Sequence, residues 1–344
     1  MLSVVKSGFS KIGKNAARSF SNSSKLGSKV AVIGAAGGIG QPMSLLLKIH
    51  GNVMIEHLAL YDLVGTPGVA ADLSHCSTNA KVTGYKGPSE LPDALKGASV
   101  VVIPAGVPRK PGMTRDDLFN TNAGIVTNLA RACAEHCPGA FFLVISNPVN
   151  STVPIFSEVL KAKGVYNPQK LMGVTTLDVF RAKTFVAENL NIDIDRNSVE
   201  VDVIGGHAGT TIIPLLSQVE GAKFSEDDIK ALTHRIQFGG DEVVKAKDGA
   251  GSATLSMASA GAHYALQVLD AMQGTKGIRE CTFVENDMTD APFFASPVIL
   301  GKDGVEKILG FGKLSSFEQK LVDENVPTLK AQAQKGIDFV KNFP

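Results

Sequence analysis

The sequence lacks several features that would each define a class of protein. Its 344 residues include no tryptophan and only four cysteines, too few for a disulfide scaffold, which favours a reducing compartment. Lys and Arg number 34 against 33 for Asp and Glu, so the net charge of +1 offers no basic field to nucleic acid. No apolar run reaches the ~18 residues that span a bilayer. We therefore expect no nucleic-acid partner and no membrane insertion.

Acidic residues are absent from the whole chain before Glu56. The first 29 residues instead carry six basic residues, and eight of the first 28 are serine. Apolar residues from Leu2 to Ala16 share one face of a helical wheel, opposite the basic ones. This composition is typical of a mitochondrial transit peptide, which we expect at residues 1–20 with cleavage after Phe20 and delivery to the mitochondrial matrix. A plastid address, a disordered basic tail or a membrane-surface helix are the alternatives.

From Lys29 onward, short apolar runs alternate with helical patterns. Buried strands are expected at residues 30–33, 58–61, 100–103 and 142–145, and helices at residues 38–49 and 116–136. This alternation predicts an α/β fold with a doubly wound, mostly parallel sheet covered by helices on both faces.

The second half of the sequence has a different pattern of expected helices and strands, which indicates a second domain after a boundary between Pro148 and Val174. Helices are expected at residues 178–189, 225–247 and 252–272, and strands at 199–204, near Phe283 and at 298–300. A last helix is expected from Ser316, because the spacing of Ser316 to Gln319 fits a capping box.

The first strand runs directly into a glycine-rich turn with the spacing G-x-x-G-x-x-G. Glycine permits a tight turn and a close approach of the backbone to a pyrophosphate, and the following helix offers free N–H groups to the anion. Asp62 ends the second strand, where an acid can bind a ribose diol and repel a 2′-phosphate, so NAD is favoured over NADP. The alternatives are a turn that serves only packing and an Asp62 that caps a loop. The expected cofactor residues of the turn are Gly34, Gly37, Gly38, Ile39 and Gly40.

A loop rich in proline and glycine follows the third strand and carries Arg109, Lys110 and Arg115. Its place at the carboxyl end of a strand is where open α/β sheets bind ligands. It is either a solvated basic loop or a lid that brings arginines to an anionic substrate and excludes water. Arginine matches a carboxylate through two parallel hydrogen bonds, which lysine cannot make.

With these motifs in order, the chain resembles the NAD-dependent lactate/malate dehydrogenase family, within it the mitochondrial-type malate branch. The resemblance runs from about Lys29 to near the C-terminus. It rests on Gly34 to Gly40, Asp62, Val107 to Arg115, Ser146-Asn147-Pro148, Asp178 to Arg181 and Gly205 to Gly209. It implies a Rossmann-type NAD-binding domain over residues 28–173, an α+β substrate domain over residues 174–341, NAD as the cofactor and a homodimer.

Asp178, Arg181 and His207 form the candidate acid/base group. Asp178 and Arg181 share a helix face at positions i and i+3, which by itself is as consistent with a surface ion pair. The functional hypothesis directs both side chains into the cleft, where Arg181 binds a substrate carboxylate and Asp178 orients His207. A lone histidine is more often structural, but a paired carboxylate would fix its tautomer and stabilise the imidazolium.

The resemblance implies a role for each site residue in the interconversion of (S)-malate and oxaloacetate. His207 exchanges the proton of the C2 hydroxyl, Arg115 polarises the reacting carbonyl and Arg109 pairs with the second carboxylate. Further implied contacts are Asn147 with substrate and nicotinamide ribose, and Asn122 and Met257 with the cofactor.

Charge balance selects the substrate within the family. A dicarboxylate in a closed cleft needs a cation at each end, because an unpaired buried carboxylate costs several kcal/mol. Arg181 and Arg109 supply these two cations, so we expect strong rejection of pyruvate. The alternatives are a lactate or other 2-hydroxy-acid dehydrogenase and a non-catalytic NAD-binding scaffold, although a scaffold has no need of His207, Asp178 and three arginines.

Cys133, His136 and Cys137 suggest a metal site by composition alone. They lie on an expected helix with no fourth ligand nearby, whereas structural zinc usually has four ligands. We interpret the cysteines as reduced thiols on or under a helix and expect no metal.

Overall fold

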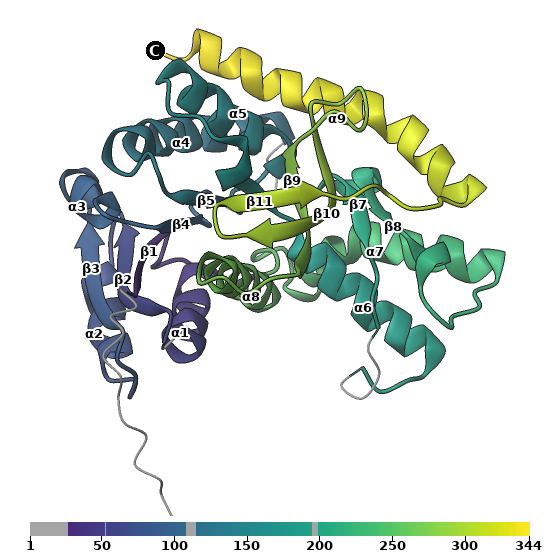
Figure 1. Cartoon of the computed structure of the whole chain (residues 1–344), viewed down its shortest axis with the longest axis horizontal. Coiled ribbons are helices and arrows are strands. Elements are labelled where there is room, and N and C mark those ends of the chain that lie inside the picture. Colours follow the sequence, from purple (N-terminus) through teal and green to yellow (C-terminus); the bar gives the residue numbers. More distant parts are fainter. Residues whose placement is uncertain (1–26, 52, 108–114, 195–198) are drawn as a thin grey trace, which may run out of the picture.

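A computed structural model of the chain describes residues 27–51, 53–107, 115–194 and 199–344, and the side chains of residues 115–118 are not included (Figure 1). The expected transit peptide at residues 1–20 and Arg109 lie outside the described residues.

The first half of the chain forms a six-stranded parallel sheet with the strand order β3-β2-β1-β4-β5-β6. Its strands are β1 (Ser28–Ile33), β2 (Ile55–Asp62), β3 (Lys81–Lys86), β4 (Val100–Ile103), β5 (Phe141–Val144) and β6 (Leu171–Val174). The apolar runs in β1, β4 and β5 form central strands because both of their faces are buried.

Successive side chains of β1 enter two different cores. Ala31 and Ile33 pack under α3, α4 and α5, whereas Val30 and Val32 pack under α1, α2 and α8. The first-half helices are α1 (Gly40–His50), α2 (Thr66–Ser74), η1 (Pro88–Glu90), α3 (Leu91–Leu95), α4 (Arg115–His136), α5 (Val149–Ala162) and η2 (Pro168–Lys170).

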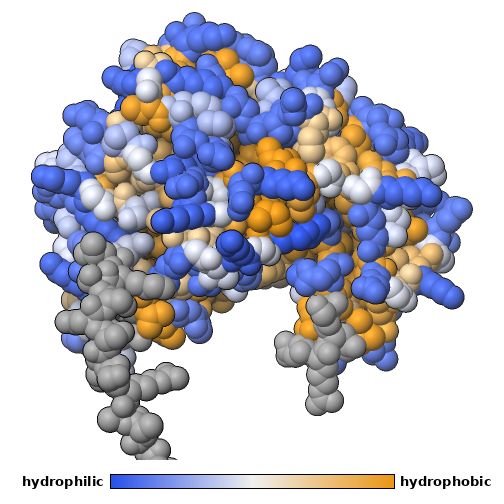
Figure 2. Space-filling model, viewed as in Figure 1, coloured by the Kyte–Doolittle hydropathy of each residue, from blue (hydrophilic) through white to orange (hydrophobic). Residues whose placement is uncertain are grey.

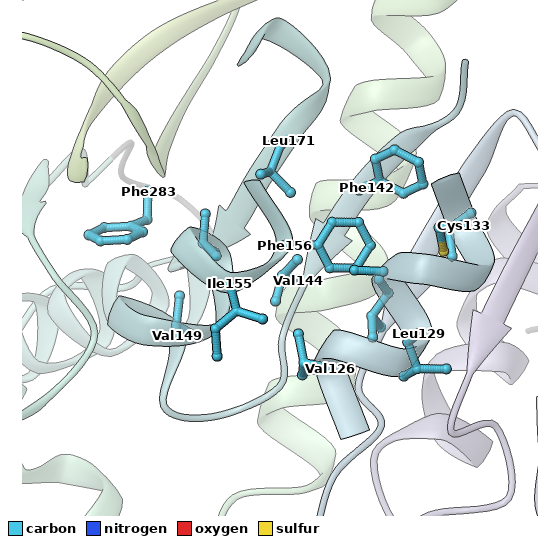
Figure 3. Close-up of a cluster of buried hydrophobic side chains, with 14 of the residues drawn as sticks. Val126, Leu129, Cys133, Phe142, Val144, Val149, Ile155, Phe156, Leu171 and Phe283 are labelled. Atoms are coloured by element: carbon cyan, nitrogen blue, oxygen red, sulfur yellow. The ribbon is translucent and has the colours of Figure 1, made fainter. Parts of the chain in front are cut away.

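Figure 3 shows the core between α4, β5 and α5, where Val126 and Leu129 of α4 lie close to Phe156 of α5. The rings of Phe142 and Phe156 are 5.1 Å apart between centroids. Each such fully buried side chain contributes about 1.5–3 kcal/mol to folding.

The second half continues the same sheet with antiparallel strands. β6 pairs with β9, and the order runs on through β10, β7 and β8, so all eleven described strands belong to one sheet. The second-half strands are β7 (Val203–Gly205), β8 (Ile212–Pro214), β9 (Ile278–Glu285), β10 (Phe293–Gly301) and β11 (Gly304–Ile308). The helices are α6 (Thr176–Leu190), η3 (Gly209–Thr211), η4 (Leu216–Gln218), α7 (Glu226–Ala246), α8 (Leu255–Met272) and α9 (Ser316–Asn342).

The predicted fold class, a doubly wound parallel sheet followed by an α+β part, is confirmed. The sequence analysis did not predict α2, β3, α3, β8 or β11, and three further details differ. The strand expected at residues 199–204 is limited to Val203–Gly205. The segment 149–174 contains α5 and β6, which the sequence analysis did not predict, although Val149, Val153, Phe156 and Leu160 of α5 have the spacing of one helix face. The last helix begins at Ser316 as expected, but its capping box joins Ser315 to Glu318, one residue earlier.

Among the described residues, none of the helices has both the length and the apolar character needed to cross a membrane. Hydrophilic residues cover most of the face drawn in Figure 2, and hydrophobic residues gather near its middle.

Candidate active site

The turn between β1 and α1 is built by glycines and backbone hydrogen bonds. Gly34 has a φ of +101°, and the N–H groups of Gly34 and Ala35 donate to the carbonyl of Tyr61 at 2.8 and 3.0 Å. A Cβ atom at Gly40 would lie 2.1 Å from the carbonyl oxygen of Gly34, so only glycine allows this approach. The first and last glycines of the motif, Gly34 and Gly40, are therefore steric requirements of the turn.

Asp62 lies beside this turn, where its carboxylate also braces the backbone. Oδ2 accepts the N–H of Ala36 at 3.0 Å, and Oδ1 accepts the N–H of Leu63 at 2.8 Å. The loop-capping alternative is thus part of the structure. Each oxygen retains a second lone pair, and the side chain is only half-buried, so the carboxylate can still accept hydrogen bonds from a ribose diol.

The start of α1 suits an anion. No side chain caps its first N–H groups, and its first turn contains no acidic residue. Gly34 packs against Ala105, which follows β4, so the turn faces the point where the strand order reverses between β1 and β4. The residues present therefore fit a dinucleotide phosphate.

The other residues expected at the cofactor have different surroundings. Asn122 is 1% exposed, its Oδ1 accepts the N–H of Val107 at 2.8 Å, and its Nδ2 donates to the carbonyls of Val107 and Asn147 at 3.3 and 2.8 Å. Asn147 is exposed. Met257 is 4% exposed and belongs to the core cluster under α8. Asn122 therefore ties together the segments that follow β4 and β5.

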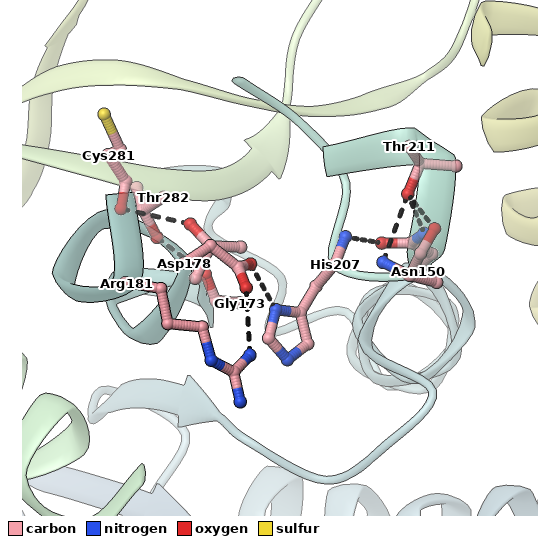
Figure 4. Close-up of polar contacts among 10 residues, drawn as sticks. Asn150, Gly173, Asp178, Arg181, His207, Thr211, Cys281 and Thr282 are labelled. Carbon is pink, nitrogen blue, oxygen red and sulfur yellow. Dashed lines mark hydrogen bonds and ion pairs between the residues drawn. The ribbon is translucent and has the colours of Figure 1, made fainter. Parts of the chain in front are cut away.

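The acid/base candidates come together although they are far apart in the sequence (Figure 4). Oδ2 of Asp178 lies 2.5 Å from Nδ1 of His207, and Nη1 of Arg181 lies 3.6 Å from Oδ1 of Asp178. Asp178 has no exposed surface. A carboxylate in that position is tolerated because the imidazole, the guanidinium and the positive end of α6 all offset its charge.

The hydrogen bond to Asp178 determines which nitrogen of His207 can exchange a proton with a substrate. Nδ1 faces the carboxylate and therefore donates to it, so Nε2 is the nitrogen that is free to exchange a proton. The His207 side chain is 11% exposed and that of Arg181 is 14% exposed. Both side chains line one cavity.

This cavity has a volume of about 180 Å³. Besides Asp178, Arg181 and His207, its lining consists of Gly209, Ile212, Gln237, Phe238, Gly240 and Asp241. At about 30 Å³ per water molecule, it holds several waters or one small organic acid. The last four of these residues come from α7, for which the sequence predicted only a helix, and they were not among the expected site residues.

A wider hollow of about 420 Å³ lies at Lys276, Gly277, Ile299, Glu306 and Lys307. Its charged side chains are exposed and carry both signs, without a base held by a carboxylate. The smaller cavity is the better candidate because it combines a buried acid, a base and an arginine.

The remaining expected residues are the two arginines that follow β4 and the cysteines of α4 and its C-terminal end. Arg115 is the first residue of α4, and its side chain lies outside the described residues, as does all of Arg109. Cys133 in α4 and Cys137, which directly follows α4, are buried free thiols, and burial raises the pKa of Cys133 well above its usual value. Within the described ranges, no group of three or more potential ligands is arranged for a metal.

Comparisons with known proteins identify the family. Residues 28–173 match the model of the lactate/malate dehydrogenase NAD binding domain, and residues 175–340 match that of the alpha/beta C-terminal domain. The chain is 61% identical over 327 residues to the mitochondrial malate dehydrogenase of Bos taurus, covering 95% of this chain and 96% of the bovine one.

Solved structures give the same fold. A malate dehydrogenase from Cryptosporidium parvum matches with a TM-score of 0.78 at 29% identity, covering 92% of this chain and 100% of the other. A lactate dehydrogenase from the same organism, complexed with lactic acid and NAD, matches with 0.76 at 26% identity, covering 92% and 99%. Fold alone does not separate the two activities. As its motifs predicted, the chain belongs to the lactate/malate dehydrogenase family.

Proposed function

We propose that this protein is an NAD-dependent malate dehydrogenase that interconverts (S)-malate and oxaloacetate by reversible hydride transfer. The observation that carries the proposal is the buried Asp178–His207 pair, which lies beside Arg181 on the wall of a cavity. The 61% identity to mitochondrial malate dehydrogenases of Bos taurus and Homo sapiens supports the malate branch.

The residues divide the chemistry between them. When bound, NAD⁺ accepts the hydride from C2 of the substrate. His207 takes the C2 hydroxyl proton on Nε2 during malate oxidation and returns it during oxaloacetate reduction. Asp178 holds the ring in the tautomer with Nδ1 protonated and stabilises the positive charge that the ring acquires. The glycine turn and Asp62 hold the dinucleotide.

The arginines select the substrate. Arg181 faces the cavity from α6 and binds the carboxylate next to C2. We assign the second carboxylate to Arg109 and the polarisation of the carbonyl to Arg115, on the motif around them. Asn147 contacts substrate and nicotinamide ribose. Pyruvate has a methyl group in place of the second carboxylate and would leave Arg109 desolvated without a partner.

The test is the loss of NADH absorbance with the full chain, comparing oxaloacetate with pyruvate. Fast loss with oxaloacetate alone is expected. Arg109→Gln should lower oxaloacetate turnover by roughly 100-fold or more, with much less effect on pyruvate, whereas the neighbouring Lys110→Gln serves as the control. Turnover of pyruvate in preference to oxaloacetate would indicate a lactate dehydrogenase, and NADH binding without turnover would indicate a scaffold.

We further propose a mitochondrial-matrix protein, cleaved after residue 20, that forms a homodimer. Its NAD-binding domain spans residues 28–173 and its substrate domain residues 174–341. The basic, acid-free N-terminal segment supports the address. Import by isolated mitochondria with and without residues 1–20 tests the address, and sedimentation velocity tests the dimer.

A further inference from the structure

His207 is held from two opposite sides, and only one of them is the carboxylate. On the other side, the backbone N–H of His207 donates to Oδ1 of Asn150 at 2.8 Å (Figure 4). Asn150 lies in the first turn of α5 and is 1% exposed. Resting on the function proposed above, we infer that Asn150 is a positioning residue, which fixes the main chain of the acid/base histidine while Asp178 fixes its ring.

The amide of Asn150 is itself held in one orientation. Its Nδ2 donates to Oε1 of Gln332 in α9 at 2.8 Å and to Oγ1 of Thr211 at 3.3 Å. Thr211 in turn donates to the carbonyl of Ala208 at 2.8 Å, just after His207. Since both amide hydrogens have acceptors, Oδ1 can point only toward the N–H of His207.

Gly205 and Gly206, which precede His207, allow the backbone to approach Asn150 closely. A Cβ atom at Gly206 would lie 2.7 Å from both Oδ1 and Nδ2 of Asn150 and 2.5 Å from Leu329. Gly205 has a φ of +97°, and a Cβ atom there would lie 2.1 Å from the carbonyl oxygen of Thr211. The glycine pair therefore allows the loop to press its backbone against Asn150, and does not simply leave space around the imidazole.

Asn150 also connects the histidine to the cofactor side of the molecule. It follows Asn147 by three residues, and the carbonyl of Asn147 accepts Nδ2 of Asn122 at 2.8 Å. One short segment thus carries the proposed nicotinamide contact and the support of His207. During malate oxidation the hydride leaves C2 and the proton leaves the oxygen bound to C2. The nicotinamide and His207, which accept them, must therefore be held in fixed positions relative to each other. A displacement of about 1 Å can lower the rate about 100-fold.

The experiment compares Asn150→Ala with Ser151→Ala. Ser151 is the next residue of α5, is 3% exposed and donates to the carbonyl of Gln332 at 2.8 Å. Within the described part of the chain, it forms no hydrogen bond with His207. Each enzyme is mixed with NADH, titrated for bound cofactor and then mixed rapidly with oxaloacetate. The rate of the single turnover reports the chemical step, and its amplitude reports the fraction of folded sites.

We expect Asn150→Ala to slow the single turnover roughly 10- to 100-fold with full amplitude and unchanged NADH affinity. Ser151→Ala should keep the rate of the wild type. A lower amplitude at the wild-type rate, or equal rates in both variants, would overturn the inference. If Asn150→Ala does not fold, Gln332→Leu removes the support of the amide without touching His207, and it should slow the same step by a smaller factor. A wild-type enzyme that binds NADH but does not reduce oxaloacetate would refute the proposed function instead.

Discussion

The cofactor turn and the acid/base cluster are built in opposite ways. The turn uses one stretch of chain from Gly34 to Asp62, and its hydrogen bonds are made by backbone N–H groups. The cluster draws Asn150 from α5, Asp178 from α6 and His207 from the loop after β7, and each contact involves a side chain. The turn depends on glycines, which have no side chain, whereas the cluster depends on particular side chains.

This difference predicts that binding and chemistry can be damaged separately. A turn without side chains fails when atoms are added, because the backbone has no room to yield. A cluster of buried polar groups fails when a partner is removed, because the remaining group keeps its desolvation cost. The following changes test that separation, beginning with the largest expected effect.

Removing the base should greatly slow the reaction and leave cofactor binding unchanged. His207→Asn is expected to lower kcat for oxaloacetate reduction about 10²- to 10⁴-fold, because proton transfer loses its positioned group. NADH affinity, measured by fluorescence titration, should not change. His75→Asn, at the exposed end of α2, is the control and should leave both quantities unchanged. A matching loss of NADH affinity in His207→Asn would contradict the separation.

Adding one methyl group to the turn should produce the reverse pattern. Gly40→Ala places Cβ against the backbone of Gly34 and Ala35, and overpacking of this kind costs about 1–3 kcal/mol. We expect weaker NADH binding and a lower melting temperature. The matched control is Gly68→Ala in α2, where the added Cβ meets no atom within 4 Å and should stabilise the helix slightly. Equal NADH affinities in the two variants would refute the steric argument.

Neutralising Asp62 should weaken cofactor binding without disrupting the turn. In Asp62→Asn the amide oxygen can still accept the N–H of Ala36, but the charged hydrogen bonds to a ribose diol are lost. We expect the Kd for NADH to rise about tenfold and the Kd for NADPH to stay the same or fall. Calorimetric titration with both cofactors measures this, and an equal rise for both would mean that Asp62 only braces the loop.

The smallest effect should come from thiol modification, because neither region uses a cysteine. Burial, together with the charge of nearby Asp202, raises the pKa of Cys281 to about 12. Below that pH the thiol stays protonated, so the reactive thiolate is scarce at neutral pH. Iodoacetamide on the native protein should therefore label only the half-buried Cys76, as mass spectrometry can show, and activity should persist. Labelling of Cys133 or Cys281 before unfolding would be the contrary result.

Much of this molecule could be predicted from local patterns. The apolar runs at residues 100–103 and 142–145 became buried strands nearly residue for residue, because strands enclosed on both faces need an unbroken apolar sequence. The glycine turn was identified for a similar reason, since the steric limit at Gly40 comes from Gly34 and Ala35, which are close to it along the chain. Asp62 was identified by its place at the end of the second strand. Asp178, Arg181 and His207 were identified by motif order.

Other features were decided only by tertiary packing. Helix α5 carries Pro154 in its interior, a residue that argues against a helix, and its helical state is supported by packing between α4 and α9. Ser315 competes with Ser316 for the cap of α9, and it prevails because Glu318 also accepts two hydrogen bonds from Ser217. Asn150 is the strongest case. Its residue type indicates nothing by itself, and its importance arises from Gln332 and Gly206, which only the folded chain brings to it. The sequence alone determined where the backbone must bend and which groups could react, because those depend on neighbours, and the tertiary structure decided how the reacting groups are held, because their supports come from distant parts of the chain.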